Sequence, residues 1–309
     1  MRIIKMLAVT LVVLVIAGVG FLYLAPEKAT HLAVNLERDG AGLERKEITT
    51  PDGLRWVYLE GGKGTPLLLV HGFGGNKDNF TRTAKYLTPH YHVIIPDLIG
   101  FGESDHPQQA DYSPNAQAER LRAFAKALGM EDVHIGGNSM GGEIALCYAA
   151  LHPKEVKSLW LLDPGGIWSA PASEVRKTIE QTGHNPLLVK TPDEFASLLQ
   201  LAMSKPPFMP RPILDVMAQE PIHNYALSER IFKQIVEDSI EKRVNGLATP
   251  TLIVWGKEDR VINVATADML HGMMPNSKVL LMDGIGHVPM LEVPKRAAED
   301  YLQFRKSLQ

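Results

Sequence analysis

The sequence has one cysteine, Cys147, so a disulfide cannot form within a single chain. The H-E-x-x-H, C-x-x-C and P-loop patterns are absent from it, and it therefore implies no metal, nucleotide or other cofactor. The net charge is only −3 with acidic and basic side chains interspersed, which argues against a nucleic-acid partner. With 309 residues and no internal repeat, the chain can form one large domain with an insertion.

The amino end carries the longest uncharged stretch of the chain. Residues 6–25 contain no charged side chain and follow Arg2 and Lys5, and about 20 such residues are the length that spans a bilayer. A cleaved signal peptide is the alternative, but its apolar core is usually shorter, and Pro26 follows the nearest cleavage candidate. We therefore expect an uncleaved anchor. The basic residues before it favour a cytoplasmic amino terminus, with the rest of the chain across the membrane.

After the anchor, predicted strands and helices alternate, which indicates a mostly parallel sheet covered on both faces. The strands are expected at 54–60, 66–71, 91–96, 132–137, 156–163, 249–255 and 277–282, and the helices at 80–88, 114–128, 139–152, 263–274 and 294–307.

Four regions follow from this pattern. Residues 1–28 form the anchor, and 29–50 form a juxtamembrane linker or amphipathic segment, because Ala29, Leu32, Ala33 and Leu36 have helical spacing. The α/β core comprises 51–165 and 247–309. Residues 166–246 are too long for a connecting loop and are rich in Met and Pro, so they predict a mostly helical cap. Its apolar side chains either line a site for a long chain or pack the cap onto the core.

The segment Gly137-Asn138-Ser139-Met140-Gly141 lies between a predicted strand and a predicted helix. G-x-S-x-G in that context is typical of a nucleophile elbow, although an ordinary glycine-flanked turn would also fit. Side chains at Gly137 or Gly141 would collide where strand and helix cross. The Met140 N–H, at the helix start, is expected to contribute to an oxyanion hole.

A serine nucleophile needs a base, and the base needs an acid to hold it. Asp259 follows the predicted strand 249–255, and His287 lies on a glycine-bounded loop after the strand 277–282, which sets it apart from the other histidines. Carboxyl ends of parallel strands meet at one edge of a sheet, so both residues are expected near Ser139. Asp163, also at a strand end, is the alternative acid.

The loop His71-Gly72-Phe73-Gly74-Gly75 follows the predicted strand 66–71 and is the expected source of a second oxyanion donor, the Phe73 N–H. His71 is interpreted as a structural residue that holds this loop. Asp97 has the same interpretation for the next loop.

Several runs in this sequence match a known family. They are His71-Gly72-Phe73 with Lys77-Asp78, Gly137 to Gly142, Thr191-Pro192-Asp193-Glu194 with Leu199-Gln200-Leu201, Trp255 to Asp259 with Ala267-Asp268-Met269-Leu270, and Gly286-His287. From about residue 50 onward the chain resembles the serine-hydrolase branch of the α/β-hydrolase superfamily. With its anchor, it looks like the membrane-anchored monoacylglycerol lipases and lysophospholipases, including bacterial membrane-bound phospholipases A.

The resemblance implies an α/β-hydrolase fold with a helical cap and an N-terminal transmembrane helix. It also implies a Ser139, Asp259 and His287 triad, with Phe73 and Met140 N–H groups as the oxyanion hole. The expected activity is hydrolysis of lipid acyl esters without a cofactor. The implied location is the bacterial inner membrane, with the catalytic domain facing the periplasm, or secretion if the amino-terminal segment is cleaved.

Other functions remain open at this point. The elbow also resembles that of hydrolases that cleave carbon–carbon bonds in ring-fission products, and a small-ester esterase would use the same residues. A ligand-binding protein that keeps a hydrolase pocket without turnover is a third possibility. Oligomeric state cannot be predicted, since the anchor contains no G-x-x-x-G.

Overall fold

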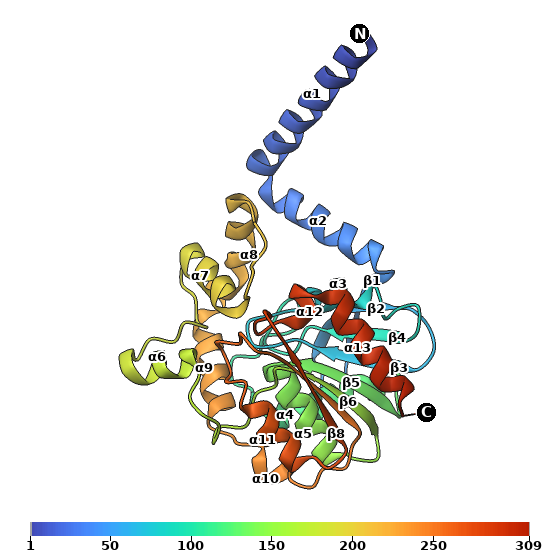
Figure 1. Ribbon diagram of the computed structural model, residues 1–309, viewed down its shortest axis with the longest axis vertical. Helices are drawn as coiled ribbons and strands as arrows, with labels where there is room; N and C mark the ends of the chain where they lie inside the picture. The colour runs from blue at the N-terminus through green and yellow to red at the C-terminus, as the bar shows by residue number, and fades with distance from the viewer. Residues whose placement is uncertain (1, 309) are drawn as a thin grey trace.

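The fold is built on an eight-stranded sheet (Figure 1). The computed structural model describes residues 2–308, except for the side chains of residues 2–5, 8–9 and 12–16. In spatial order the strands are β1 (Leu43–Thr49), β2 (Arg55–Gly61), β4 (His92–Pro96), β3 (Pro66–Val70), β5 (Val133–Asn138), β6 (Val156–Leu162), β7 (Thr251–Gly256) and β8 (Ser277–Met282). The β1–β2 and β2–β4 pairs are antiparallel and the others are parallel. The predicted mostly parallel sheet is therefore confirmed.

The register aligns the carboxyl ends of the last four strands. Asn138 of β5 lies beside Leu162 of β6, Leu162 beside Val254 of β7, and Val254 beside Leu280 of β8. Strands β5, β6 and β7 are almost wholly buried, as expected for apolar parallel strands covered on both faces. The loops after these strands consequently begin at one edge of the sheet, which is where an open α/β sheet places its ligand-facing groups.

Helices cover both faces of the sheet (Figure 1). One layer consists of α4 (Pro114–Ala127), α5 (Met140–Leu151) and α11 (Thr266–Met273). The other consists of η1 (Lys77–Phe80), α3 (Thr81–Ala84), α12 (Pro289–Glu292) and α13 (Pro294–Lys306). Each layer has its own buried apolar cluster: Leu121 and Ile144 belong to the first, and Ala84 and Tyr301 to the second. The helix expected at 80–88 is much shorter than predicted.

The segment 29–50 is not simply a linker. Helix α2 (Pro26–Gly40) covers its first half, and 43–49 form β1, which pairs antiparallel with β2 at the edge of the sheet. Leu43 is buried, while the side chains of residues 44–47 are exposed. This edge strand escaped prediction because it is mostly charged, a composition that also protects an exposed edge from pairing with other chains.

The cap is helical. Between β6 and β7 the chain forms α6 (Glu174–Thr182), α7 (Pro192–Ala202), α8 (Arg211–His223), α9 (Tyr225–Val236) and α10 (Glu241–Val244). Helix α8 packs against α2 and also contacts α1 (Arg2–Leu24), while α2 itself contacts β1 and α3 of the core (Figure 1).

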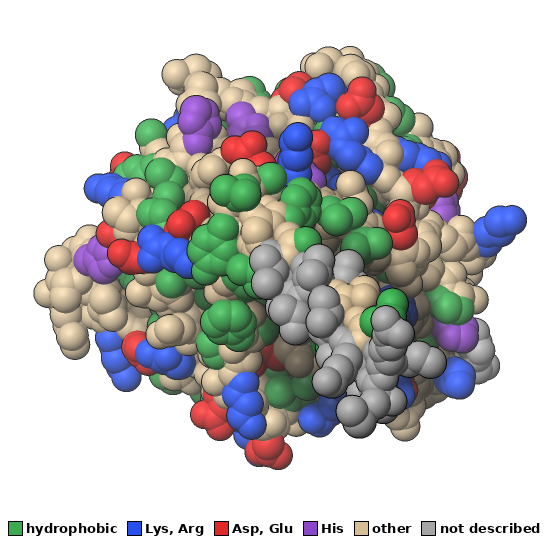
Figure 2. All heavy atoms as spheres, turned by 90° about the horizontal axis from the view of Figure 1, so that it is seen from above, with side chains coloured by type: hydrophobic (Ala, Val, Ile, Leu, Met, Phe, Trp, Pro, Cys, Tyr) green, Lys and Arg blue, Asp and Glu red, His purple; other side chains and the backbone are tan. Residues whose placement is uncertain are grey.

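Helix α1 projects away from the folded body (Figure 1). Judged on its described residues alone, no helix is both long and apolar enough to cross a membrane. Figure 2 looks at the end of the molecule that bears α1, and hydrophobic side chains gather on this face. Exposed large apolar residues near it include Leu24, Leu32 and Leu36 on α1 and α2, and Met217 on α8. Phe208, on the loop before α8, is 92% exposed.

Candidate active site

Ser139 occupies a strained turn between β5 and α5. Its backbone angles are φ 53° and ψ −122°, a conformation that side-chain-bearing residues rarely adopt. A Cβ at Gly137 would collide with the backbone of Gly141, and a Cβ at Gly141 would collide with the carbonyl oxygens of Val70 and His71. The predicted need for both glycines is thereby confirmed. With glycine at these two positions, α5 can approach β3 and β5 closely without a collision.

Two backbone N–H groups lie free beside this serine. Within residues 2–308, neither the Phe73 nor the Met140 N–H has a hydrogen-bond partner. The loop that carries Phe73 lies close to Ser139: a Cβ built on Gly72 would be 3.1 Å from the Ser139 Cβ. Phe73, Ser139 and Met140 line one cavity. This arrangement could hold a developing oxyanion.

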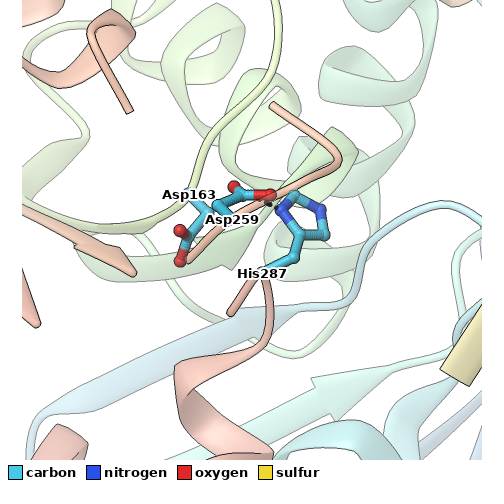
Figure 3. A group of neighbouring side chains, drawn as sticks. All are labelled: Asp163, Asp259 and His287. Atoms are coloured by element: carbon cyan, nitrogen blue, oxygen red, sulfur yellow. Dashed lines mark hydrogen bonds and ion pairs between the residues drawn. The ribbon is translucent and has the colours of Figure 1, made fainter. Parts of the chain in front are cut away.

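Asp259 and His287 meet at the same edge of the sheet. The Asp259 Oδ2 and His287 Nδ1 atoms are 2.8 Å apart, and both side chains are almost wholly buried (Figure 3). The other oxygen, Oδ1, accepts hydrogen bonds from the N–H groups of Val261 (2.7 Å) and Ile262 (3.0 Å). These bonds fix the carboxylate, which in turn orients the imidazole through Nδ1 and leaves Nε2 for other chemistry.

Asp163, the alternative acid, lies beside this pair but plays no equivalent part in it. It is fully buried, and its Oδ1 accepts a hydrogen bond from the Gly256 N–H at 2.9 Å. Burial raises the pKa of Asp163 well above its ordinary range, and the neighbouring Asp259 raises it further. His287 is hydrogen-bonded to Asp259 and not to Asp163. The geometry therefore favours Asp259 as the acid, in agreement with the sequence.

Two residues that support this site escaped the sequence analysis. The Asn138 Nδ2 donates hydrogen bonds to the carbonyl oxygens of Leu162 (3.0 Å) and His287 (2.9 Å). Glu292 accepts hydrogen bonds from the N–H groups of Gly286 (2.8 Å) and Ser204 (2.9 Å), so it joins the histidine loop to the cap. The position of Asn138 within the elbow motif could have identified it as a supporting residue, whereas no motif surrounds Glu292.

His71 and Asp97 are structural, as predicted. The His71 Nε2 accepts the Leu98 N–H at 3.0 Å, and burial lowers the pKa of this ring, so it remains neutral. Asp97 accepts hydrogen bonds from the Lys77 N–H (2.7 Å), the Lys77 Nζ (2.8 Å) and the Glu103 N–H (2.8 Å). Together they hold the backbone on both sides of the oxyanion loop.

The cavity beside Ser139 has a volume of about 320 Å³ and runs between the core and the cap. Its cap side is mainly apolar, with Trp168, Val175, Ile179, Phe232 and Ile235 among the lining residues. Glu143 lies in the core wall, fully buried, and both of its carboxyl oxygens lack a partner within residues 2–308. Burial raises the pKa of Glu143 well above its ordinary range.

Comparisons with known proteins identify the family of this chain. The model of the alpha/beta hydrolase fold family matches residues 65–294. Lipase 1 of Psychrobacter immobilis is 46% identical over 288 residues, which cover 91% of this chain and 90% of the relative. Monoacylglycerol lipase ABHD6 of Homo sapiens is 30% identical over 254 residues, covering 78% of this chain and 75% of the relative.

A solved structure is also similar over nearly the whole length. The crystal structure of a membrane phospholipase A, described as a bacterial virulence factor, superimposes with a TM-score of 0.89 and 38% identity, covering 98% of both chains. A family match over most of the chain, together with relatives at 30% identity or more, shows the family and the activity. The chain belongs to the α/β-hydrolase fold family, and it is a carboxylic ester hydrolase.

Proposed function

We propose that this protein is a membrane-anchored serine hydrolase that releases fatty acids from lipid esters. The observation that carries the proposal is Ser139 in its strained turn at the wall of an apolar cavity, with the neighbouring Asn138 bonded to the loop that holds the His287–Asp259 pair. The lipase, monoacylglycerol lipase and phospholipase A similarities support a lipid substrate.

In the proposed mechanism, Ser139 attacks the ester carbonyl carbon while His287 accepts the hydroxyl proton. Asp259 holds the imidazole and stabilises its charged form. The Phe73 and Met140 N–H groups receive the oxyanion of the tetrahedral intermediate, and each such donor contributes about 3 kcal/mol in comparable enzymes. His287 then protonates the leaving alcohol, and the acyl-enzyme forms. A water molecule deprotonated by His287 attacks this acyl group, and the fatty acid is released with Ser139 regenerated.

The cavity supports an acyl chain as the group bound beside Ser139. Its volume of about 320 Å³ is at the small end of ligand pockets, which are largely apolar with a few polar groups that fix orientation. Cap helices α6 and α9 supply Val175, Ile179, Phe232 and Ile235 to its wall. Burying one methylene group there contributes about 0.8 kcal/mol, so a long chain gains more than a short one.

The amino-terminal helix is proposed as the anchor. Helix α1 has 23 residues, and residues 6–25 carry no charge. At about 1.5 Å per residue it would exceed the bilayer core, which is about 30 Å thick. Arg2 and Lys5 favour a cytoplasmic amino terminus, which would put the catalytic domain in the periplasm of a bacterial cell. The exposed Leu32, Leu36 and Phe208 would then lie near the membrane surface.

The test is fatty acid release by detergent-purified full-length protein on monoacylglycerol, lysophospholipid and diacyl phospholipid. We expect hydrolysis of lipid that disappears in Ser139→Ala while the protein stays folded, with Ser197→Ala, an exposed serine on α7, as the matched control. Asp259→Asn should lower kcat by several orders of magnitude, about 10⁴-fold in a comparable triad.

The ratio among the three substrates would identify the preferred lipid class. Activity that survives in Ser139→Ala would refute the nucleophile assignment. Hydrolysis of a short soluble ester with none of the three lipids would refute the lipid substrate and point to a small-ester esterase. Faster turnover of a ring-fission dienoate would point to carbon–carbon bond hydrolysis.

A further inference from the structure

A second carboxyl group is buried against the Asp259–His287 pair. Oxygen atoms of Asp163 and Asp259 and a ring nitrogen of His287 all lie within 4.8 Å of one another (Figure 3). Asp163 and the side chain of Asp259 have no exposed surface. Two carboxylates this close in a dry site repel each other strongly, so both cannot be ionised at neutral pH.

The hydrogen bonds distinguish the two acids. Asp259 accepts three: two backbone N–H groups on Oδ1 and the His287 ring on Oδ2. Asp163 accepts one on Oδ1, and its Oδ2 is buried without a partner within residues 2–308. An ionised carboxylate can only accept, whereas a protonated one also donates. Asp259 is therefore held as the anion, and a proton on Asp163 would make its unpartnered oxygen a donor.

The surroundings of Asp163 favour that proton. Burial is the largest cause that raises its pKa, and the charge of the neighbouring Asp259 raises it further. Glu292 adds a smaller effect in the same direction, and the Gly256 N–H opposes it. His287 is a further titratable group beside this carboxyl, with a ring nitrogen within 4.8 Å of an Asp163 oxygen.

The backbone holds this arrangement in place. Asp163 has φ 47°, in the left-handed region that residues other than glycine rarely enter, and its N–H donates to the Val254 carbonyl oxygen at 3.0 Å. The chain thus keeps a buried carboxyl group on a strained backbone at this position. Strain of this kind persists at functional sites because the surroundings enforce it.

We propose that Asp163 is a positioning residue: it carries a proton at neutral pH and donates a hydrogen bond to the Asp259 carboxylate. This bond keeps Asp259 ionised and directed at His287, so that a single negative charge faces the imidazolium formed during catalysis. The inference rests on the proposed roles of Asp259 and His287.

The first readout is vibrational. A buried protonated carboxyl has its own infrared carbonyl band, and we expect one such band of the full-length protein to be lost in Asp163→Asn. Glu143→Gln is the matched control, because Glu143 is the other fully buried carboxyl with a strongly raised pKa, and its band should be a different one. An unchanged spectrum in Asp163→Asn would overturn the proposal.

The second readout is the pH profile of kcat/KM on a short soluble ester. The acid limb reports His287, whose imidazole must be neutral to accept the serine proton. If Asp163 is neutral, Asp163→Asn leaves the charge near His287 unchanged, and the limb stays at the same pH. If Asp163 were ionised, removing its charge would take away an interaction that favours the imidazolium, and the limb would move to lower pH, which would also overturn the proposal.

The third readout is rescue by the conservative variant. Asp163→Ala removes the donor, and we expect kcat to fall about tenfold to a hundredfold, the usual effect of losing a hydrogen bond to a charged group. Asn tolerates the left-handed backbone and can still donate, so Asp163→Asn should recover most of this loss. A loss in Asp163→Asn equal to that in Asp259→Asn would make Asp163 the triad acid and refute the inference. If Ser139→Ala still abolishes hydrolysis, the proposed function survives that result.

Discussion

Asn138 offers the sharpest test of how the site is held together. Its side chain is 2% exposed, and its Nδ2 bridges the carbonyl oxygens of Leu162 and His287 at 3.0 and 2.9 Å. The bridge joins the end of β6 to the loop that carries His287, the proposed base. Asn138→Ala removes two hydrogen bonds at once and leaves two carbonyl oxygens without that donor.

The expected cost follows from these contacts. The Leu162 carbonyl oxygen keeps the Ser139 N–H as a donor at 3.0 Å, so losing its bond to Asn138 costs about 1 kcal/mol. Losing the bond to the buried His287 carbonyl oxygen costs about 1–3 kcal/mol, because that oxygen loses its Asn138 donor. We therefore expect Asn138→Ala to lose about 2–4 kcal/mol of stability, which lowers Tm by about 4–12 °C in a domain of this size. Freeing the His287 backbone should also lower kcat about tenfold to a hundredfold, because displacing a catalytic group by about 1 Å can cost a factor of 100.

The matched control is another hydrogen bond between β5, which carries Asn138, and β6. The Ser158 Oγ and His134 Nδ1 atoms are 2.8 Å apart in a buried bond that joins β6 to β5 away from the site. Ser158→Ala should lose about 1 kcal/mol with kcat unchanged. Calorimetry measures the stability, and ester hydrolysis at saturating substrate measures kcat. Equal kcat values in Asn138→Ala and Ser158→Ala, with Tm lowered in both, would show that the bridge stabilises the fold without positioning His287.

Two further predictions concern the fold and its pH dependence. Gly141→Ala should prevent folding or abolish activity, because its Cβ would collide with the Val70 carbonyl oxygen. Gly272 has open space around it, so Gly272→Ala should be tolerated. A folded and active Gly141→Ala would contradict the elbow geometry. A hydrogen bond with Arg122 lowers the pKa of Glu155 from 4.5 to about 2, so its stabilisation is complete above pH 4.5 and disappears as the pH falls through about 2. Glu155→Gln should thus cost about 1 kcal/mol at pH 7 and progressively less below pH 4.5, and a cost that grows on acidification would contradict this sign.

The parts of this site that could be predicted from the sequence depend on local patterns. Ser139 lies between glycines at a strand–helix junction, and Asp259 and His287 follow apolar strands, so order along the chain and the geometry of a parallel sheet suffice to place them. The strand β1 could not be found in this way. It is a strand because it pairs with β2, and its own sequence, rich in charges, has no strand-like alternation.

Residues whose roles depend on distant partners were out of reach. The two acceptors of Asn138 lie 24 and 149 residues away, and Ser204, which Glu292 binds, lies 88 residues away. The same holds for Asp163: its position at a strand end was visible, but its protonation depends on burial and on Asp259, which only the folded chain brings together. Titration behaviour is a property of the environment and not of the residue type.

The cap is joined to both loops that carry the proposed acid and base. At the end of α7, the His287 N–H donates to the Ala202 carbonyl oxygen at 2.7 Å. At the start of α6, the Val175 N–H donates to the carbonyl oxygen of Arg260, the residue after Asp259, at 3.2 Å. The Arg260 side chain also forms an ion pair with the first residue of α6, but exposed pairs of this kind contribute little stability. A displacement of either α6 or the end of α7 would therefore break a backbone hydrogen bond to one of these two loops.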